Sequence, residues 1–394
     1  MFLQYENKKK ELDILLNTPK ADLSVLFGRG SKNKLIQGNN LNILKSLLED
    51  YNLAGKIDLV YIDPPFATNT HFKIGTDRAN TISSSEDDEI AYSDILIGAD
   101  FLEFIRERLI FLRELLSDRG SIYLHIDYKI GHYIKLIMDE VFGIKNFRND
   151  IARIKCNPKN FNRKAYGNTK DLILFYSKTD NPTWNDPRTP FTQEDSEKLF
   201  KKTDANGRKY TTIPLHAPGE TLNGNTGKEW RGVKPPKGRH WRSDPKLLEK
   251  WDKQGLIEWS TNGVPRKKIF IDEKDGKKTQ DIWEFKDPQY PSYPTEKNSD
   301  LLKFIINASS NENDTVLDCF AGSGTTLASA QELNRNWIGI DQSEQAINVV
   351  MKKLSNVSNS LFSKVDYEFM VGKLNTRKRQ DSKSLVYNRA NLSK

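Results

Sequence analysis

Amphipathic stretches and short continuous apolar runs alternate along the first 180 residues. Residues 39–51 place their leucines and isoleucine on one helical face, and residues 56–63 contain the apolar run IDLVYI, which is typical of a buried strand. The same succession continues with helices predicted over 101–117 and 129–142 and strands over 121–127, 150–155 and 170–176. Continuous apolar strands between such helices need cover on both faces, so the pattern predicts an α/β fold with a parallel sheet.

This periodicity is lost in the middle of the chain and returns near its end. Between about residues 181 and 290, prolines, glycines, tryptophans and lysines dominate, which favours a separate inserted domain. Helices are again predicted over 300–306, 325–333 and 343–354, with strands over 314–320 and 336–341. The expected divisions are an N-terminal extension (1–30), a first half of the main domain (31–180), the insert (181–290), a second half (291–372) and a polar tail (373–394). Residues 67–99, which include SSSEDDE, are expected to form a lid or a disordered loop.

Charge and composition narrow the class of protein. The chain of 394 residues has a formal net charge of +8, which favours a polyanionic partner, although a solvated basic surface would give the same value. Its two cysteines, Cys156 and Cys319, and its five histidines show no metal-ligand spacing, so we expect neither a disulfide nor a metal site. No apolar run is long enough to span a bilayer, and the first residues lack the order of a signal peptide. We therefore expect a cytoplasmic protein without a membrane partner.

A glycine-rich turn near the carboxyl end has the features of a cofactor site. The segment from Asp318 to Gly324 follows a predicted strand and opens a helix, and its glycines let backbone N–H groups approach a ligand. Asp341 ends the next predicted strand, where a carboxylate can accept hydrogen bonds from ribose hydroxyls. The turn G-S-G-T-T-L lacks the third glycine that a pyrophosphate favours, whereas the sulfonium of S-adenosylmethionine would suit Asp318 as a counter-charge. The alternative is that both aspartates only cap turns.

The sequence Asp63-Pro64-Pro65-Phe66 lies where another predicted strand ends. An exocyclic amine on a base is a poor nucleophile because its lone pair is delocalised into the ring. A fixed Asp63 carboxylate and the Pro64 carbonyl could accept its two N–H groups and aim the lone pair at a methyl group. Phe66 could stack against a base extruded from the duplex. The alternative is a strand-ending turn followed by a core phenylalanine.

These two segments together carry a family resemblance. LVYIDPPF with VLDCFAGSGTT resembles the catalytic and cofactor motifs of DNA amino-methyltransferases, and their order along the chain is similar to that of the permuted β class. The resemblance implies a Rossmann-like S-adenosylmethionine-dependent methyltransferase fold, circularly permuted, with an inserted target-recognition domain. It implies a site-specific methyltransferase of a restriction-modification system that acts on N6 of an adenine flipped out of duplex DNA, and it implies that Asp63 and Gly322 lie at one edge of the sheet.

The resemblance extends to further contacts with S-adenosylmethionine. YPTEKNSDLLKFII is similar to the family's additional cofactor-contacting helix, and QGNN resembles the motif at the cofactor's adenine end. Many relatives have aspartate at the position of Asn39. The complete set of residues expected at the cofactor is Gly38, Asn39, Thr295, Lys297, Asp318, Phe320, Ala321, Gly322, Ser323, Gly324, Asp341 and Gln342.

The insert is the predicted contact with double-stranded DNA. Cations can bind phosphates, arginines can contact guanine edges, and aromatic rings can stack on disturbed base steps. The tryptophans could instead form the small core of the insert. The residues predicted to contact DNA are Lys228, Trp230, Arg231, Lys234, Lys237, Arg239, His240, Trp241 and Arg242.

Several alternatives stay open at this point. The same acceptor geometry would hold N4 of cytosine, although relatives that act on cytosine more often begin the loop with serine where this chain has Asp63. A Rossmann-type oxidoreductase, a non-catalytic DNA-binding subunit, and an RNA or protein methyltransferase are further classes. The resemblance suggests a homodimer. A restriction subunit is a further possible partner, although type III modification subunits are generally longer than this chain. His125 alternates with Tyr123 and Asp127 along a strand, which favours a hydrogen-bonded structural role.

Overall fold

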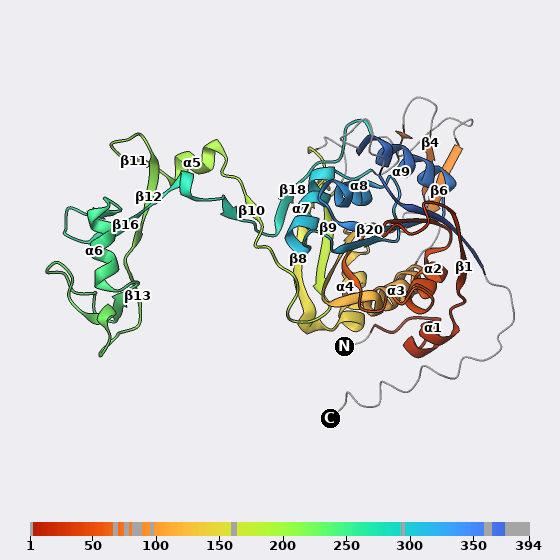
Figure 1. Ribbon diagram of the computed structural model, residues 1–394, viewed down its shortest axis with the longest axis horizontal. Coiled ribbons are helices and arrows are strands. Elements are labelled where there is room, and N and C mark those ends of the chain that lie inside the picture. Colours follow the sequence, from red (N-terminus) through yellow and green to blue (C-terminus); the bar gives the residue numbers. More distant parts are fainter. Residues whose placement is uncertain are drawn as a thin grey trace. The chain divides into compact units, whose positions relative to one another are not determined.

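The computed structural model describes residues 3–65, 70–74, 79–80, 89–94, 98–158, 164–291, 293, 296–357 and 365–374. The chain divides into two compact units. The larger unit comprises Met1–Asn185 and Gln280–Lys394, and the smaller unit comprises Asp186–Thr279 (Figure 1). The smaller unit therefore lies inside the 181–290 segment predicted as an insert, while residues 280–290 belong to the larger unit.

A ten-stranded sheet forms the centre of the larger unit, in the order β1-β21-β2-β20-β19-β3-β7-β9-β8-β18. Its strands are β1 (Ala21–Phe27), β21 (Glu368–Leu374), β2 (Lys34–Gln37), β20 (Asn336–Asp341), β19 (Thr315–Asp318), β3 (Ile57–Ile62), β7 (Leu116–Ile126), β9 (Lys170–Ser177), β8 (Phe147–Ile154) and β18 (Ile282–Glu284). The α/β class is as predicted, but the sheet is mixed, because β1 and β9 run antiparallel to their neighbours. The described residues between β8 and β9 contain no helix, and a parallel pair would need a long crossover connection.

Helices cover both faces of this sheet (Figure 1). On one face α2 (Asn40–Glu49), α3 (Ala99–Leu115) and α4 (Gly131–Phe142) pack against the strands, with α1 (Glu11–Asn17) beside them and the short 3-10 helix η1 (Ile144–Asn146) after α4. On the other face lie α7 (Ser299–Ser309), α8 (Thr325–Glu332) and α9 (Glu344–Val357).

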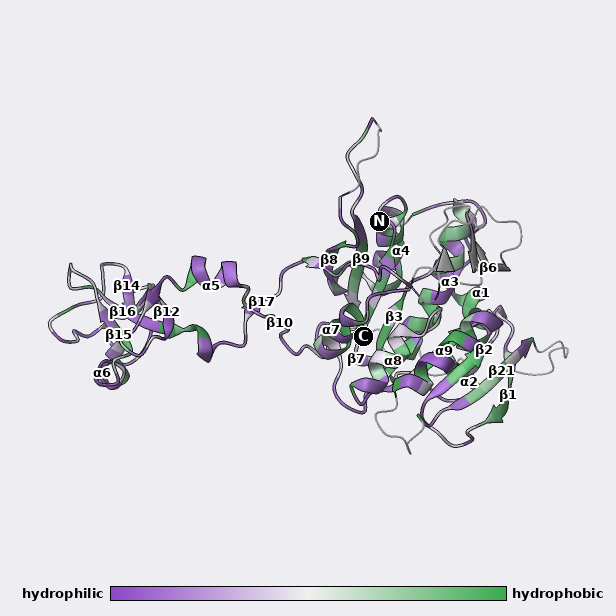
Figure 2. Ribbon diagram, turned by 90° about the horizontal axis from the view of Figure 1, so that it is seen from above, coloured by the Kyte–Doolittle hydropathy of each residue, from purple (hydrophilic) through white to green (hydrophobic). Residues whose placement is uncertain are grey.

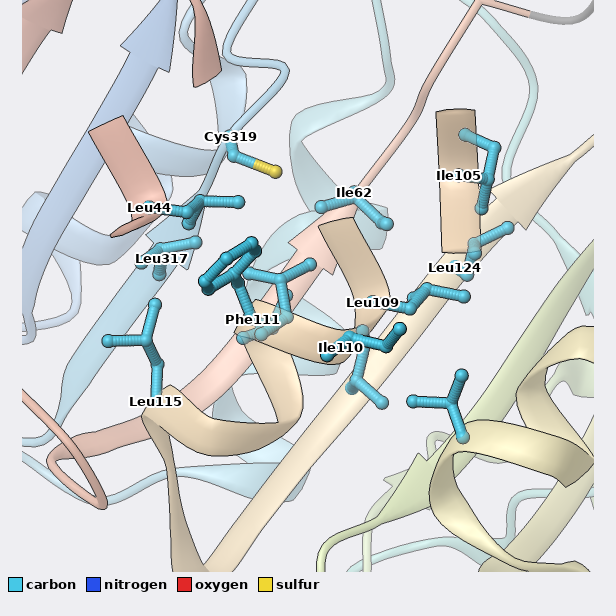
Figure 3. Close-up of a cluster of buried hydrophobic side chains, with 14 of the residues drawn as sticks. Leu44, Ile62, Ile105, Leu109, Ile110, Phe111, Leu115, Leu124, Leu317 and Cys319 are labelled. Atoms are coloured by element: carbon cyan, nitrogen blue, oxygen red, sulfur yellow. The ribbon is translucent and has the colours of Figure 1, made fainter. Parts of the chain in front are cut away.

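The core beneath α3 shows how the apolar pattern fixes this arrangement. Leu109 and Phe111 are fully buried against side chains of the neighbouring strands, including Ile62, Leu124 and Leu317 (Figure 3). Truncating one such leucine to alanine removes its contacts and leaves a cavity, which costs about 2–5 kcal/mol. This packing holds the carboxyl ends of β3 and β19 in register.

The described residues of two predicted polar segments include β-strands. Between residues 67 and 99, where a lid or a disordered loop was predicted, the described residues form a three-stranded antiparallel sheet of β4 (Thr70–Ile74), β5 (Ala79–Asn80) and β6 (Glu89–Asp94). The predicted polar tail begins inside a strand, because Lys373 and Leu374 end β21 and pair with β1. Residues 375–394 lie outside the described residues.

The smaller unit has its own sheet and its own small core. Its four-stranded sheet has the order β11 (Lys202–Thr203), β12 (Lys209–Pro214), β16 (Pro265–Phe270) and β15 (Ile257–Trp259). Around it are the pairs β10 (Arg188–Thr189) with β17 (Lys277–Lys278) and β13 (His216–Pro218) with β14 (Arg239–Trp241), the helices α5 (Gln193–Leu199) and α6 (Pro245–Lys253), and the 3-10 helices η2 (Asn225–Gly227) and η3 (Ile271–Glu273). The core consists of Leu215, Trp230, Trp241, Leu248 and Ile257. Hydrophilic residues dominate α5 and α6 (Figure 2).

Across the described part of the chain, no helix is long and apolar enough to cross a membrane.

Candidate active site

The sheet brings the two predicted motifs together. Strands β19 and β3 are parallel neighbours, with Val316 opposite Leu59 and Leu317 opposite Val60. Their carboxyl ends open into one cavity of about 510 Å³, which both Asp63 and Gly322 line. The expected adjacency of these two residues is therefore confirmed, although the chain segment between them includes the whole smaller unit.

Most of the residues predicted for the site line this cavity. They are Asp63, Pro64 and Pro65 of the catalytic segment and Gly38, Asn39, Lys297, Asp318, Phe320, Ala321, Gly322, Ser323, Asp341 and Gln342 of the cofactor set. Gly324 is not part of the lining but caps the N-terminus of α8. Phe66 and Thr295 lie outside the described residues. The lining also contains Asn40, Tyr61, Phe104, Arg108, Tyr293, Cys319, Thr325, Thr326 and Ser343, for which no role was predicted.

The glycine-rich turn has a backbone that side chains would obstruct. Gly322 and Gly324 have φ values of +49° and +74°, in the left-handed region that favours glycine. A Cβ atom on Gly324 would lie 2.8 Å from Cγ2 of Val350 on α9, which is closer than real Cβ contacts allow. The turn therefore packs closely against α9, and its residues line the cavity.

Asp318 and Asp341 organise this turn. Asp318 accepts hydrogen bonds from the backbone N–H of Phe320 (2.9 Å) and from the Thr326 hydroxyl (2.6 Å). Asp341 accepts from the N–H of Gly322 (2.8 Å) and, through its other oxygen, from the N–H of Ser343 (2.9 Å). Each carboxylate oxygen can accept more than one hydrogen bond, so these contacts leave capacity for a ligand. Burial raises the pKa of Asp318 to about 7 and also raises the pKa of Asp341.

The side chain of Asp63 has one occupied and one vacant oxygen. Its Oδ2 lies 2.7 Å from Nζ of Lys297, and the two side chains are only 15% and 9% exposed. Its Oδ1 is buried and has no hydrogen-bond partner among the described residues. Lys297, which the resemblance implied at the cofactor, thus pairs with the proposed catalytic carboxylate in this structure.

A buried polar chain lies behind Asp63. The Tyr61 hydroxyl is 2.9 Å from Nδ1 of His125, and Nε2 of His125 is 3.3 Å from Asp171, which also accepts a hydrogen bond from Lys155 (2.6 Å). Burial opposes ionisation of Asp171, but the hydrogen bond from His125 and the charge of Lys155 together keep its pKa below the usual value. Because the ionised Asp171 can only accept, Nε2 of a neutral His125 donates to it, and Nδ1 accepts a hydrogen bond from the Tyr61 hydroxyl. The hydrogen-bonded role predicted for His125 is confirmed, and its pKa is lowered by burial.

Arg108 is a buried cation at the cavity wall that the sequence did not identify. Its guanidinium donates to Oδ1 of Asn40 (2.7 Å) and to the carbonyl of Phe104 (2.7 Å), and it stacks on the Phe104 ring. No carboxylate of the described residues lies within ion-pair distance of it, and burial lowers its pKa to about 10. An arginine on an amphipathic helix is ordinarily expected at the surface, and only the fold shows that this one faces a cavity.

The side chain of Asn39 caps the N-terminus of α2. Its Oδ1 accepts hydrogen bonds from the backbone N–H groups of Leu41 (3.0 Å) and Asn42 (3.4 Å). Asn39 also lines the cavity.

The residues predicted to contact DNA differ in accessibility within the smaller unit. Trp230 and Trp241 are 5% and 1% exposed, because they form the core with Leu248, so their predicted contact with bases is wrong for this structure. Arg231 is neutralised by Glu249 and Asp252. The side chains of Lys228, Lys234, Lys237, Arg239 and Arg242 are exposed, and that of His240 is partly exposed.

Comparison with known proteins identifies the family. A model of the DNA methylase family matches residues 57–352. The chain is 41% identical over 329 residues to the Type II methyltransferase M.EcaI of Enterobacter cloacae, an alignment that covers 82% of this chain and 69% of that protein. It is 26% identical to the Type III restriction-modification enzyme StyLTI Mod subunit of Salmonella typhimurium, covering 78% of this chain and 51% of the subunit, so the chain spans about half the length of that relative.

Solved structures are more distant. The PvuII DNA methyltransferase (cytosine-N4-specific) matches 84% of this chain and 89% of its own with a TM-score of 0.47 and 13% identity. M1.HpyAVI, solved as a complex with SAM, matches 82% of this chain and 100% of its own with a TM-score of 0.42 and 18% identity. From the family match and the relative at 41% identity, we conclude that the chain belongs to the DNA methylase family and is a DNA amino-methyltransferase of the β class.

Proposed function

We propose that this protein transfers a methyl group from S-adenosylmethionine to N6 of an adenine flipped out of duplex DNA, as the modification enzyme of a restriction-modification system. The observation that carries the proposal is the vacant, buried Oδ1 of Asp63, a residue that lines the same cavity as the glycine-rich turn. A buried acceptor without a donor costs about 1–3 kcal/mol, and an exocyclic amine would supply the missing N–H.

The residues around Asp63 support this chemistry. Lys297 holds Oδ2, so the carboxylate cannot rotate freely, and Oδ1 is left to accept an N–H of the amine. The Pro64 carbonyl would accept the second N–H, and the fixed φ of two successive prolines keeps that carbonyl in place. Withdrawing both N–H groups from the ring plane directs the nitrogen lone pair toward the donor methyl group, which is catalysis by orientation and by a preorganised acceptor.

The cavity suits S-adenosylmethionine in size and charge. Its volume of about 510 Å³ is in the range of small-molecule sites. The carboxylates of Asp318 and Asp341 complement a cofactor with a sulfonium and an ammonium group, and Asp341 has acceptor capacity for ribose hydroxyls. Arg108, which has no carboxylate partner among the described residues, suits the cofactor's own carboxylate. When bound, the cofactor supplies an electrophilic methyl group.

Base identity can be tested directly. Unmethylated DNA incubated with the protein and S-adenosylmethionine is digested to nucleosides, which are then separated and identified by mass spectrometry. We expect N6-methyladenine, because an aspartate opens the catalytic segment. Finding only N4-methylcytosine would overturn the base assignment and favour the alternative function. Finding no methylated base, with S-adenosylmethionine bound, would overturn the proposed function.

We further propose that the smaller unit recognises the DNA sequence. Its basic composition and its separate core support this role, since such a unit can change its surface without disturbing the larger one. Exchanging the smaller unit, residues 186–279, for that of a relative should change the methylated site and preserve cofactor binding. An active exchanged enzyme that keeps its original site would contradict the proposal.

A further inference from the structure

Three arginines of the smaller unit converge on one histidine. Arg239 of β14 has its NH1 3.2 Å from Nδ1 of His216, and Arg242 donates from Nε to the carbonyl of His216 (3.2 Å). Arg266 of β16 is brought alongside by the pairing of β12 with β16, and it donates to the hydroxyl and the carbonyl of Thr212, both at 2.9 Å. We call Arg239, Arg242 and Arg266 the arginine cluster.

The arginine cluster differs in its partners from the other arginines of the unit. The smaller unit contains six arginines. Three of them are paired with carboxylates, at 2.7 Å for Arg188 with Asp186, 2.8 Å for Arg208 with Asp272 and 2.9 Å for Arg231 with Glu249. Within the described part of the chain, the three members of the cluster have no carboxylate at ion-pair distance, and their hydrogen bonds go to neutral acceptors.

Among the described residues, no ion pair neutralises the three arginines around His216. The pKa of His216 is lowered, first by burial and then by the positive charges of Arg239, Arg242 and Arg266. Like charges gathered without counter-charges repel one another, and an external anion would relieve that repulsion. Guanidinium groups suit a phosphate, since their planar donors match its oxygens.

The cluster stands on a rigid support. The strands β13 and β14 pair with His216 opposite Trp241, and Trp241 is buried in the core with its Nε1 donating to the carbonyl of Lys228 (2.9 Å). The indole that was predicted to contact a base thus anchors the strand that carries Arg239. An arginine on an anchored strand loses less conformational freedom on binding than one on a mobile loop, so Arg239 is preorganised for a ligand.

We propose that the arginine cluster binds phosphates of the DNA backbone and so docks the smaller unit on the duplex independently of sequence. This inference rests on the proposed function, and it names the residues of the smaller unit that would contact the DNA backbone. It assigns a role to Arg266, which the sequence did not single out, and it removes Arg231 from the predicted contacts because its charge is already neutralised.

The test uses the full chain with Arg239→Gln, Arg242→Gln, Arg266→Gln and the triple variant. Affinity for a fluorescein-labelled duplex of random sequence is measured by anisotropy over a series of KCl concentrations. Each arginine that meets a phosphate should lower the slope of log affinity against log salt by about 0.9. The matched control is Arg208→Gln, which removes an arginine of the same unit whose charge is neutralised internally, and it should keep the wild-type slope.

Three results are informative. A folded triple variant with the wild-type affinity and slope would overturn the assignment. So would a triple variant that keeps its affinity for random duplex and loses methylation only at certain sequences, since that would indicate base contacts. Methyl transfer from tritiated S-adenosylmethionine is measured in parallel, and a wild type that binds the duplex through the cluster but transfers no methyl group would overturn the proposed function alone.

Discussion

Lys297→Gln distinguishes two roles for Lys297: the contact with Asp63 that the structure shows, and the contact with the cofactor that the sequence predicted. The ammonium of Lys297 lies 2.7 Å from Oδ2 of Asp63, and both side chains are largely shielded from solvent. A charge-assisted hydrogen bond of this kind contributes about 1.5–3 kcal/mol. If that energy serves to orient Asp63 in the transition state, single-turnover methyl transfer should fall about 10- to 150-fold, since about 1.4 kcal/mol corresponds to a factor of ten. Lys297→Arg keeps the charge and should recover part of the rate.

Cofactor affinity and a matched control complete this experiment. Calorimetric titration of Lys297→Gln with S-adenosylmethionine should give a Kd within about threefold of the wild-type value. Lys8→Gln is the control, because Lys8 forms a similarly shielded pair with Glu140 (2.6 Å) and does not line the cavity. Lys8→Gln should reduce stability without slowing transfer. A normal transfer rate in Lys297→Gln, together with weakened cofactor binding, would refute our interpretation and return Lys297 to the cofactor.

Two further predictions concern the cofactor half of the cavity. Asp341→Ala should weaken S-adenosylmethionine binding by about 1–3 kcal/mol through lost hydrogen bonds, with turnover partly rescued at high cofactor concentration; an unchanged Kd in a titration would contradict the ribose assignment. Because burial raises the pKa of Asp318 to about 7, its contribution to stability is present at low pH and is lost as the pH rises through 7. The cofactor's cations favour the ionised carboxylate, so affinity should increase from pH 6 to pH 8, and ligand-free Asp318→Asn should melt higher than the wild type at pH 8. An affinity independent of pH, or a lower melting temperature of Asp318→Asn at pH 8, would argue against this role.

The pattern of apolar residues predicted the strands around the site, but it did not predict which strands pair or in which direction they run. IDLVYI and NWIGID are continuous apolar runs, and both form buried strands, β3 and β20. The antiparallel direction of β9 and the pairing of β18 with β8 depend on contacts between distant segments, which periodicity does not contain. The three residues of β18 are also too few for a periodic signal.

For the site, the motifs located the cavity but not every contact within it. Asp63 and Gly322 were predicted because prolines and glycines mark the ends of their strands. Arg108 was missed since nothing in the sequence of an amphipathic helix distinguishes a buried arginine from an exposed one. Trp241 shows the opposite error, because an aromatic residue among lysines and arginines resembles a DNA contact until its burial is known.

The central claim is that Asp63 performs the chemistry and does not bind the cofactor, and Asp63→Ala tests it most directly. Methyl transfer to DNA and the Kd for S-adenosylmethionine are measured on the same folded preparation. We predict that transfer falls on the order of a hundredfold or more, the usual effect of removing a preorganised acceptor, while the cofactor still binds. Near-normal transfer by the folded Asp63→Ala protein would contradict the account.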